Sequence, residues 1–409
     1  MLPPYLTPKL VTTLQSYDRT QFAHDLVAGL IVGVVAIPLA LAFGIASGVT
    51  PAEGLYAAVI GGFVISLLGG SRGQIGGPTG AFVVIIYGIV HQYGREALTV
   101  TTIMAGVILI VMGLFRMGNL IKWIPYPVTT GFTSGIAVII FSSQVKDLLG
   151  LRMGAVPPEF VDKWGAYFHA LPSADWHTFA LSAATLAVLV FLPRLTKKIP
   201  SPFAALVFAT GAAAALGLPV ETIGSRFGDL PRGLPMPHLP SVDFKTAASL
   251  VRPATVVALL AAIESLLSAV VADGMIGSRH RSSMELVAQG VANIVSPLFG
   301  GIPVTGAIAR TATNIKSGGR TPVAGITHAA VLACVLLFAG PLVSRIPLCA
   351  LASILVIVSY NMSEWRSFAF LLKSPRSDVA VLVTTFGLTV LGDLTGAGAR
   401  YTSRDLLEA

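Results

Sequence analysis

Two short stretches decide the fold: Gly76-Gly77-Pro78-Thr79-Gly80-Ala81 and Gly300-Gly301-Ile302-Pro303-Val304-Thr305-Gly306-Ala307. Each places glycine and proline before an apolar segment, and each contains the triplet Thr-Gly-Ala, at positions 226 residues apart. The segments that begin at these triplets, 79–91 and 305–315, are thirteen and eleven residues long. Helices of those lengths span roughly 20 and 16 Å, which is too short for a bilayer core of about 30 Å. We therefore predict two half-helices that begin inside a membrane.

The composition places the chain in a membrane. Apolar types make up 54% of the 409 residues, charged types make up only 11%, and the mean hydropathy is +0.80. Soluble domains carry about a quarter charged residues, so a soluble globular enzyme and a disordered chain are both excluded. The net charge of +8 lies in basic residues between apolar runs, where it orients helices against an anionic leaflet. We therefore expect a lipid bilayer as a partner and no nucleic acid.

Thirteen apolar segments are candidate spans, and helices are expected because the strands of a membrane barrel would alternate apolar and polar residues. With the N-terminus in the cytoplasm, fifteen Lys and Arg lie on the cytoplasmic side and nine on the opposite side, mostly in two longer loops. Long loops count less in the positive-inside rule, so a cytoplasmic N-terminus is expected. The candidate spans are 26–47, 51–69, 78–92, 98–115, 130–148, 177–193, 202–217, 253–274, 284–299, 304–315, 321–341, 346–360 and 377–395.

The two halves of the chain are predicted to be inverted repeats. The 226-residue offset also carries the run 51–69 onto 277–295, and it carries Pro38 onto Glu264. A repeat of seven spans is odd, so the second copy crosses the membrane in the opposite direction. The chain turns polar where a fourteenth span is expected, which we interpret as a truncated or altered tail. The predicted segments are a cytoplasmic N-terminal segment (1–24), a first transmembrane repeat (25–218), an extracytoplasmic loop (219–252), a second, inverted repeat (253–395) and a polar tail (396–409).

The half-helices supply the chemistry of an anion site. The first N–H groups of a helix have no intrahelical partner, and this end carries about half a positive charge, which attracts anions. The hydroxyls of Thr79 and Thr305 are candidate donors to a ligand oxygen. The alternative is that the small residues only allow close helix packing, but the glycines precede short helices, which favours a site. The residues small enough for a close backbone approach to the ligand are Gly80, Ala81, Gly306 and Ala307.

Two charged residues, Arg310 and Glu264, lie in the middle of predicted spans. Arg310, on the second half-helix, either attracts the anion or pairs with an acid such as Glu264. Glu264 either exchanges a proton during transport or stays ionised as the partner of Arg310, because burial and a nearby cation act on a carboxyl group in opposite directions. Ser268 lies one helical turn beyond Glu264 on the same face. We assign Arg310 and Ser268 to substrate binding and Glu264 to proton coupling.

The sequence contains no motif of an enzyme or of a cofactor site. A Walker A sequence is absent, and the two cysteines, Cys334 and Cys349, form no recognisable disulfide or zinc framework. We therefore predict that the protein is not an enzyme and that it uses neither a cofactor nor a metal.

Several groups of residues, spread over about 22–395, together resemble the SulP family of anion transporters, the sulfate permeases related to prestin and pendrin. They are Asp25-Leu26-Val27-Ala28-Gly29-Leu30, Val35-Ala36-Ile37-Pro38, Gly54-Leu55-Tyr56, Ile124-Pro125-Tyr126-Pro127-Val128, Gly131-Phe132-Thr133-Ser134-Gly135, Ile263-Glu264-Ser265-Leu266-Leu267, Gly290-Val291-Ala292-Asn293-Ile294 and Gly318-Gly319-Arg320-Thr321.

The resemblance implies an all-α membrane protein of seven plus seven spans, with core and gate domains that move relative to each other. It implies an anion site between the third and tenth helices, facing the first and eighth, which adds Phe43 to the site residues. It also implies a homodimer and a cytoplasmic STAS domain, and this sequence contains neither that domain nor the last helix. Many members have Gln where this chain has Leu39. The loss of that polar ligand favours an organic carboxylate over sulfate.

We therefore predict a secondary active transporter of a small anion (a dicarboxylate, bicarbonate or a sulfate-like ion) that works as a proton symporter by alternating access. The first alternative is an uncoupled anion exchanger or channel-like conductor on the same fold. A nucleobase permease, which shares the general architecture, is the second alternative. A membrane enzyme or a motor protein is a further one, and the missing catalytic motifs count against the enzyme. The expected location is a bacterial inner membrane.

Overall fold

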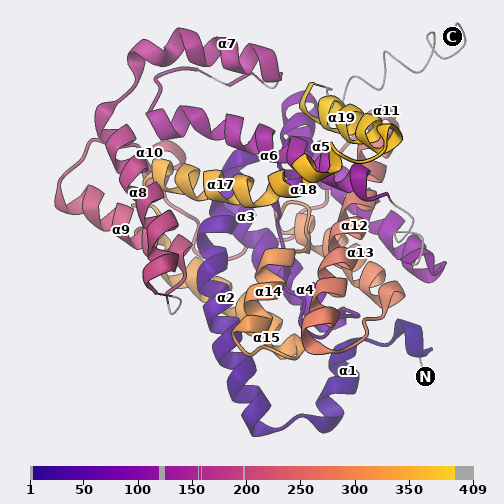
Figure 1. Ribbon diagram of the computed structural model, residues 1–409. Helices are drawn as coiled ribbons and strands as arrows, with labels where there is room; N and C mark the ends of the chain where they lie inside the picture. Colours follow the sequence, from indigo (N-terminus) through magenta and orange to yellow (C-terminus); the bar gives the residue numbers. More distant parts are fainter. Residues whose placement is uncertain (1–2, 119–124, 155, 158, 197–198, 392–409) are drawn as a thin grey trace, which may run out of the picture.

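The computed structural model describes residues 3–118, 125–154, 156–157, 159–196 and 199–391, and in these ranges it is helical with one two-stranded sheet (Figure 1). The predicted polar tail 396–409 and the end of the last predicted span, 392–395, lie outside the described residues. The α-helices and strands are α1 Lys9–Thr13, α2 Arg19–Ala46, α3 Pro51–Tyr56, α4 Gly62–Leu68, β1 Gly76–Gly77, α5 Val83–Leu114, α6 Tyr126–Leu149, α7 Phe160–Ala170, α8 Trp176–Leu195, α9 Ser201–Ala215, α10 Ile223–Phe227, α11 Phe244–Ser249, α12 Val251–Ile276, α13 Ser282–Leu298, β2 Thr305–Gly306, α14 Ile308–Lys316, α15 Pro322–Phe338, α16 Gly340–Val343, α17 Leu348–Met362, α18 Trp365–Leu371 and α19 Arg376–Leu391.

Local sequence signals set several of the helix ends. Thr50 and Glu53 form a capping box at the start of α3, in which each side chain accepts from the other's backbone N–H. The Asp18 carboxylate accepts from a backbone N–H at the start of α2. Gly150 and Gly277, at φ 60° and 75°, follow the last residues of α6 and α12. Glycine occupies these positions because left-handed backbone costs it nothing.

Each predicted span coincides with a helical segment, and the two spans 78–92 and 98–115 are joined in one long element. A 3-10 turn, η4 (Gly80–Phe82), runs directly into α5, but Gly94 inside α5 has φ 84° and ψ −178°, which is not helical. The element therefore consists of a short helix over 80–93 and a second over 95–114. The short helix spans roughly 21 Å, and α14, with nine residues, spans roughly 14 Å, so both are half-helices, as predicted.

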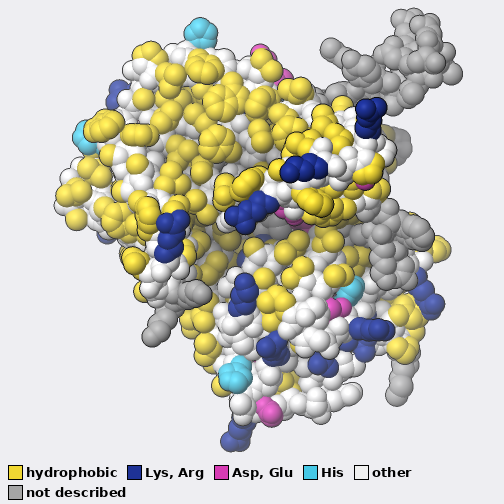
Figure 2. Space-filling view, in the orientation of Figure 1, with side chains coloured by type: hydrophobic (Ala, Val, Ile, Leu, Met, Phe, Trp, Pro, Cys, Tyr) yellow, Lys and Arg dark blue, Asp and Glu magenta, His cyan; other side chains and the backbone are white. Residues whose placement is uncertain are grey.

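The outer surface fits a lipid environment. Among the described residues, seven helical segments are long and apolar enough to cross a membrane, and α9 and α15 are shorter apolar helices. Large apolar side chains such as Phe191, Phe208 and Leu259 are exposed, and hydrophobic side chains cover most of the upper part of the molecule in Figure 2. Soluble monomers rarely expose a continuous apolar surface of that kind. The protein is therefore a multi-pass integral membrane protein.

The helices pack in two groups that each combine both repeats. In the first, which we call the core group (α2–α5 and α12–α15), α2 packs on α15, and α5 packs on α12 and α13. In the second, the gate group (α6, α8, α9, α17 and α19), α6 packs on α17 and α19, and α8 packs on α9 and α17. In Figure 1, α2, α4, α14 and α15 of the core group lie in the lower part of the view, and α6, α17 and α19 of the gate group lie in the upper part. The half-helices belong to the core group and face the gate group.

Candidate functional site

The two sequence breaks meet in the structure. Strands β1 and β2 pair antiparallel, with Gly76 opposite Gly306 and Gly77 opposite Thr305. From β1 the chain continues into η4 and α5, and from β2 it continues into α14. Both half-helices therefore begin within a few residues of the same two-stranded sheet. This pairing confirms the predicted convergence of the two N-terminal ends.

Side chains of the second repeat hold the loop that precedes the first half-helix. Glu285, Thr311 and Asn314 are fully buried, and each makes hydrogen bonds to the backbone of residues 70–75 at 2.9–3.2 Å. A buried backbone group without a partner costs about 1–3 kcal/mol. Non-helical backbone is tolerated inside a membrane only where such partners exist, so these three side chains make the first break possible.

The loop before the second half-helix is held by an amide. Asn293 on α13 donates to the Val304 carbonyl at 2.8 Å and accepts from the Val304 N–H at 2.9 Å. These two hydrogen bonds take the place of those that a neighbouring strand would make with Val304, the residue directly before β2. Beside it, the Gln74 side chain donates to the Ser265 carbonyl at 3.1 Å and covers Gly306. A Cβ at position 306 would overlap the Gln74 amide, so any larger residue there would require the Gln74 side chain to move.

Arg310 links the two half-helices through the backbone. Its side chain is 3% exposed, and its guanidinium donates to the carbonyl oxygens of Pro78 and Gly76. Gly77, at φ 145°, leaves room for it, because a Cβ there would lie 2.5 Å from the guanidinium. Within the described part of the chain no carboxylate lies within 4.0 Å of Arg310. The direct ion pair with Glu264, one of the two sequence interpretations, is therefore wrong.

Thr79 and Glu264 meet at the start of the first half-helix. Thr79 Oγ1 donates to Glu264 Oε2 at 2.7 Å, and both residues are partly exposed. The threonine is the residue before η4, but its side chain caps no N–H group of that helix. This hydrogen bond therefore leaves the first N–H groups of the half-helix open, and it places an acid beside them.

Gly80 lies at one of the places where the core group touches the gate group. A Cβ at this position would lie 3.3 Å from Phe43 of α2, 3.0 Å from Ile140 of α6 and 2.9 Å from Met362 of α17. Phe43 is 5% exposed and forms an apolar wall against the first half-helix. The structure therefore brings together four of the predicted site residues: Phe43, Thr79, Gly80 and Glu264.

Two of the predicted hydroxyl ligands are occupied by the protein itself. Thr305 Oγ1 donates to the Ala261 carbonyl at 2.9 Å, and Ser268 Oγ lies 2.9 Å from Thr311 Oγ1. Both side chains are fully buried. Both are expected from the sequence to contact a ligand. Instead, Thr305 joins β2 to α12 and Ser268 joins α12 to α14. The Thr79 hydroxyl likewise donates to Glu264, so neither threonine hydroxyl is a free donor.

The small residues of the second triplet act mainly in packing. The Ala307 N–H donates to the Ile75 carbonyl at 2.9 Å, and Gly306 lies under Gln74. Ala81 of the first triplet is 1% exposed within the hydrophobic core. At these three positions the packing alternative, which sequence reasoning ranked second, describes the contacts.

The open surface of the second half-helix lies one residue further along the chain. Ile308 is 42% exposed, and Ala309 beside it is also exposed. Both belong to the first turn of α14, whose N–H groups have no intrahelical partner. Sequence reasoning missed them because neither side chain carries a polar group. The signal that was available is their place in the first turn after the break.

Comparison with known proteins identifies the family. The sequence pattern described as "Sulfate permease family" matches residues 22–385. The chain belongs to the sulfate permease family. A Bacillus subtilis member named "Putative sulfate transporter YvdB" is 47% identical over 93% of this chain and 72% of its own length. The "Bicarbonate transporter BicA" of a Picosynechococcus strain is 34% identical over 90% of this chain and 67% of its own length.

Two solved structures have the same fold as this chain. The transmembrane domain of a cyanobacterial bicarbonate transporter BicA aligns with a TM-score of 0.85 at 33% identity, over 93% of this chain and 98% of that one. A structure of SLC26A9 aligns with a TM-score of 0.87 at 18% identity, over 97% of this chain and 66% of that one, and it shows the fold alone. The predicted all-α transporter fold is therefore confirmed. Family members are membrane transporters, so the protein is not an enzyme, and its named relatives support anion transport.

Proposed function

We propose that this sulfate permease family member is a secondary active transporter that carries one small carboxylate-type anion together with a proton by alternating access. The observation that carries the proposal is the meeting of two half-helix N-termini beside the hydrogen bond between Thr79 and Glu264. The proposed ligands are the N–H groups of the first turns, at Gly80 and Ala81 on one half-helix and at Ile308 and Ala309 on the other.

Arg310 supplies the attraction without contacting the anion. The Arg310 side chain is buried near the first turns of the two half-helices, and its guanidinium donates hydrogen bonds to backbone carbonyls. Among the described residues, no carboxylate lies within 4.0 Å of this positive charge. In a medium of low dielectric constant, its field adds to that of the two helix ends. The anion therefore finds a positive potential and neutral donors in one place.

Glu264 couples the anion to a proton. An ionised carboxylate beside an anion in a low-dielectric site is strongly repelled. Uptake of a proton by Glu264 removes this repulsion and keeps its contact with Thr79, because a carboxylic acid still accepts a hydrogen bond from a hydroxyl group. Anion and proton then favour each other's binding, and the two cross together.

Alternating access follows from the position of the site between the two helix groups. The half-helices belong to the core group, and Gly80 touches the gate group at Ile140 and Met362. The loops of both breaks are bonded within the core group, so the site moves with that group as one body. A shift of the core group against α6 and α17 exposes the site to one side or to the other.

The proposed substrate class follows from the apolar residues of α2 that face the proposed anion site. Phe43 and Leu39 of α2 are apolar, so the site offers donors on one side only, which suits a planar carboxylate better than the four oxygens of sulfate. BicA proteins, which are named bicarbonate transporters, are among the relatives at 34% identity. Bicarbonate and short carboxylates are therefore our first candidates, ahead of sulfate.

We further propose that the N-terminus is cytoplasmic, in a bacterial inner membrane, and that the protein forms a homodimer. The excess of Lys and Arg in the segments on the α1 side supports the orientation. Labelling of a single cysteine placed in the exposed loop at Gly154, on the opposite side, tests it. An impermeant reagent added outside intact cells should react there, and reaction only after lysis would reverse the orientation.

Uptake into proteoliposomes tests the function. Purified full-length protein is reconstituted, and uptake of labelled bicarbonate, a dicarboxylate, sulfate and uracil is measured with and without an inward proton gradient. Proton-stimulated uptake of a carboxylate-type anion is expected. Uptake that ignores the proton gradient would indicate an exchanger or conductor. Uptake of uracil that the anions do not inhibit would indicate a nucleobase permease.

A further inference from the structure

A cavity of about 470 Å³ lies between the two helix groups, at the end of α2 that is remote from α1. The wall formed by the core group consists of the end of α2 and the stretch of α5 from Val83 to Gln92, and the opposite wall belongs to α6, α7 and α19. This stretch of α5 belongs to the first half-helix, and Val83 directly follows η4, so the cavity runs along that half-helix to within a few residues of its N-terminal end. Neither Thr79, Glu264 nor Arg310 lines it, so it is separate from the candidate site described above.

Lys163 of α7 is buried in the wall of this cavity. The residue is 5% exposed, and in the described part of the chain its ammonium group makes no hydrogen bond and no ion pair. Tyr167, one turn later, is buried on the same face of α7, whereas Val161 and Phe168 are exposed. The amphipathic helix therefore presents Lys163 inward. Loss of surrounding water lowers the pKa of this amine, and the nearby Glu159 acts in the opposite direction.

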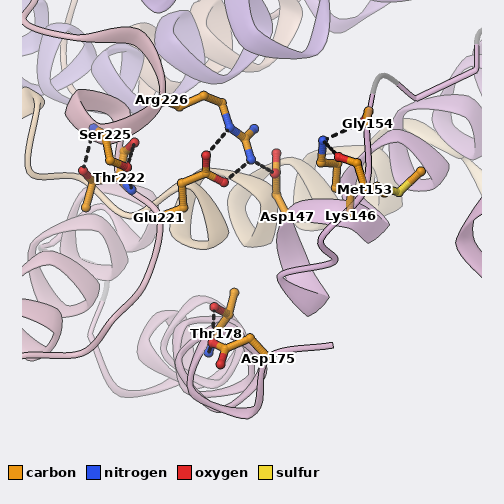
Figure 3. A network of polar contacts seen from close by, with 10 residues as sticks. All are labelled: Lys146, Asp147, Met153, Gly154, Asp175, Thr178, Glu221, Thr222, Ser225 and Arg226. Carbon is orange, nitrogen blue, oxygen red and sulfur yellow. Dashed lines mark hydrogen bonds and ion pairs between the residues drawn. The ribbon is translucent and has the colours of Figure 1, made fainter. Parts of the chain in front are cut away.

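The other basic groups of the cavity wall already have partners. Arg226 pairs with Asp147 at 2.7 Å and also with Glu221, as Figure 3 shows. The Lys146 ammonium donates to two backbone carbonyls of residues 153–154, each at 3.1 Å. His91 lies at the exposed rim. Among the described residues of the wall, Lys163 is therefore the lysine or arginine whose charged group has no hydrogen-bonded acceptor, and its ammonium nitrogen keeps enough exposure for a ligand in the cavity to reach it.

We propose that Lys163 is the centre of a second anion site, in which a small oxyanion or carboxylate binds before it reaches the half-helices. The bound anion supplies the acceptor that the protein does not, and the cavity lies within the size range of small-ligand sites. Because the cavity leads toward Val83, an anion held at Lys163 lies on the path to the first half-helix. The direction of this path rests on the proposed function, but anion binding at Lys163 does not.

Charge-selective labelling tests the site without any transport. In full-length protein with Cys334 and Cys349 replaced by serine, Ser143→Cys places a thiol in the cavity wall. Its modification rate is compared for a negatively charged (sulfonatoethyl) and a positively charged (trimethylammonioethyl) methanethiosulfonate. We expect Lys163→Gln to lower the ratio of the two rates about tenfold, because the local potential falls. Lys163→Arg should preserve the ratio.

Inorganic sulfate and acetate serve as the competing probes. Each should slow the negatively charged reagent in the parent protein and have no such effect in Lys163→Gln. Lys245→Gln, which removes an exposed lysine of α11, is the matched control and should change nothing. Lys163→Met replaces the glutamine variant if that variant does not fold. An unchanged rate ratio, or protection that persists without Lys163, would overturn the proposal. A normal labelling result together with proton-independent uptake would instead overturn the proposed function.

Discussion

Thr79 Oγ1 and Glu264 Oε2 are 2.7 Å apart, although the two residues are separated by 185 positions in the sequence. The contact joins the start of the first half-helix to the middle of α12, and thus the first repeat to the second. Both side chains are partly exposed, whereas most polar groups around the two breaks are fully buried. The pair therefore keeps a partly accessible surface on the core group.

The first prediction separates proton coupling from anion binding at Glu264. Glu264→Gln keeps an acceptor for the Thr79 hydroxyl but does not titrate, so proton-driven uptake should be lost while anion binding is retained. Glu264→Ala also removes the acceptor and should weaken binding by about tenfold. Binding of the labelled anion to purified protein and uptake with a proton gradient measure the two effects. Full proton-driven uptake by Glu264→Gln would remove this residue from the coupling mechanism.

The second prediction concerns the buried charge of Arg310. Arg310→Met leaves the carbonyls of Pro78 and Gly76 without donors, so we expect a loss of about 2–4 kcal/mol of stability and weaker anion binding. Arg310→Lys keeps the positive charge but lacks the planar guanidinium with its several N–H donors. It should therefore retain more anion binding than the methionine variant. Thermal unfolding in detergent and equilibrium anion binding report the two effects. Equal anion affinity in all three proteins would leave Arg310 with a structural role only.

The third prediction uses the glycine beneath Gln74. Gly306→Ala places a methyl group where the Gln74 amide lies, and we expect folding yield and uptake to fall sharply. Gly306→Ala combined with Gln74→Ala relieves the overlap and should recover part of the folding yield. Gly211→Ala on α9 is the control, because no atom lies within 4 Å of its added Cβ, and it should be neutral or slightly stabilising. A fully active Gly306→Ala protein would contradict the close packing of the two breaks.

The fourth prediction tests the side-chain amide of Asn293, which makes two hydrogen bonds to the backbone of Val304. Asn293→Ala removes both hydrogen bonds to Val304 and leaves two buried backbone groups without partners, which should cost about 2–4 kcal/mol. Asn293→Asp keeps the acceptor for the Val304 N–H but loses the donor, and it should not rescue stability. Thermal unfolding measures both variants against Ser296→Ala, a nearby buried change with a weaker, 3.4 Å contact. Identical unfolding temperatures for the alanine variants of Asn293 and Ser296 would contradict a special role for the amide.

The fifth prediction is a pH dependence outside the membrane-spanning helices. A hydrogen bond from Arg226 lowers the pKa of the Glu221 carboxyl below its usual value of 4.5. A carboxyl whose pKa is lower in the folded state stabilises the fold above its unfolded pKa. That contribution is lost as the pH falls through the lowered folded-state value. Because Glu221 is half-exposed, the effect should be at most about 1 kcal/mol.

Unfolding temperatures measured between neutral pH and pH 3 check this linkage. Glu221→Gln should flatten the acid part of the profile. Asp229→Asn, a change at an exposed acid in the same loop region, is the matched control and should leave it unchanged. Equal acid sensitivity of the Glu221→Gln protein and its parent would show that the ion pair with Arg226 does not contribute to stability.

Much of the fold was predictable because its signals are local. Segment length and hydropathy identify a span without knowledge of its neighbours, and glycine and proline before a short apolar run identify a break. For this reason the sequence alone predicts the half-helices at 79–91 and 305–315, without the sheet of β1 and β2. The short helices α7, α10 and α18 were not predicted, because short helices in connecting segments give no hydropathy signal.

The roles of individual site residues were less predictable, because a hydrogen-bonding group does not reveal its partner. Thr79 and Thr305 occupy identical triplets, yet one hydroxyl meets Glu264 and the other meets the Ala261 carbonyl. Gly80 faces the gate group, whereas Gly306 lies under Gln74. The inverted repeat puts matching residues into different surroundings, since the side chains that cover each break come from different parts of the chain.

The sequence by itself determined that the chain is a bundle of membrane helices with two interrupted spans, because these features depend on residue type and spacing along one segment. Only the tertiary structure decided which polar groups are satisfied within the protein and which remain open. Arg310 donates to backbone carbonyls instead of Glu264, and Lys163 meets no acceptor among the residues that the structure describes, as a result of contacts between distant segments. The physical reason is that a hydrogen bond depends on distance and direction in space, which a residue's position in the sequence does not specify.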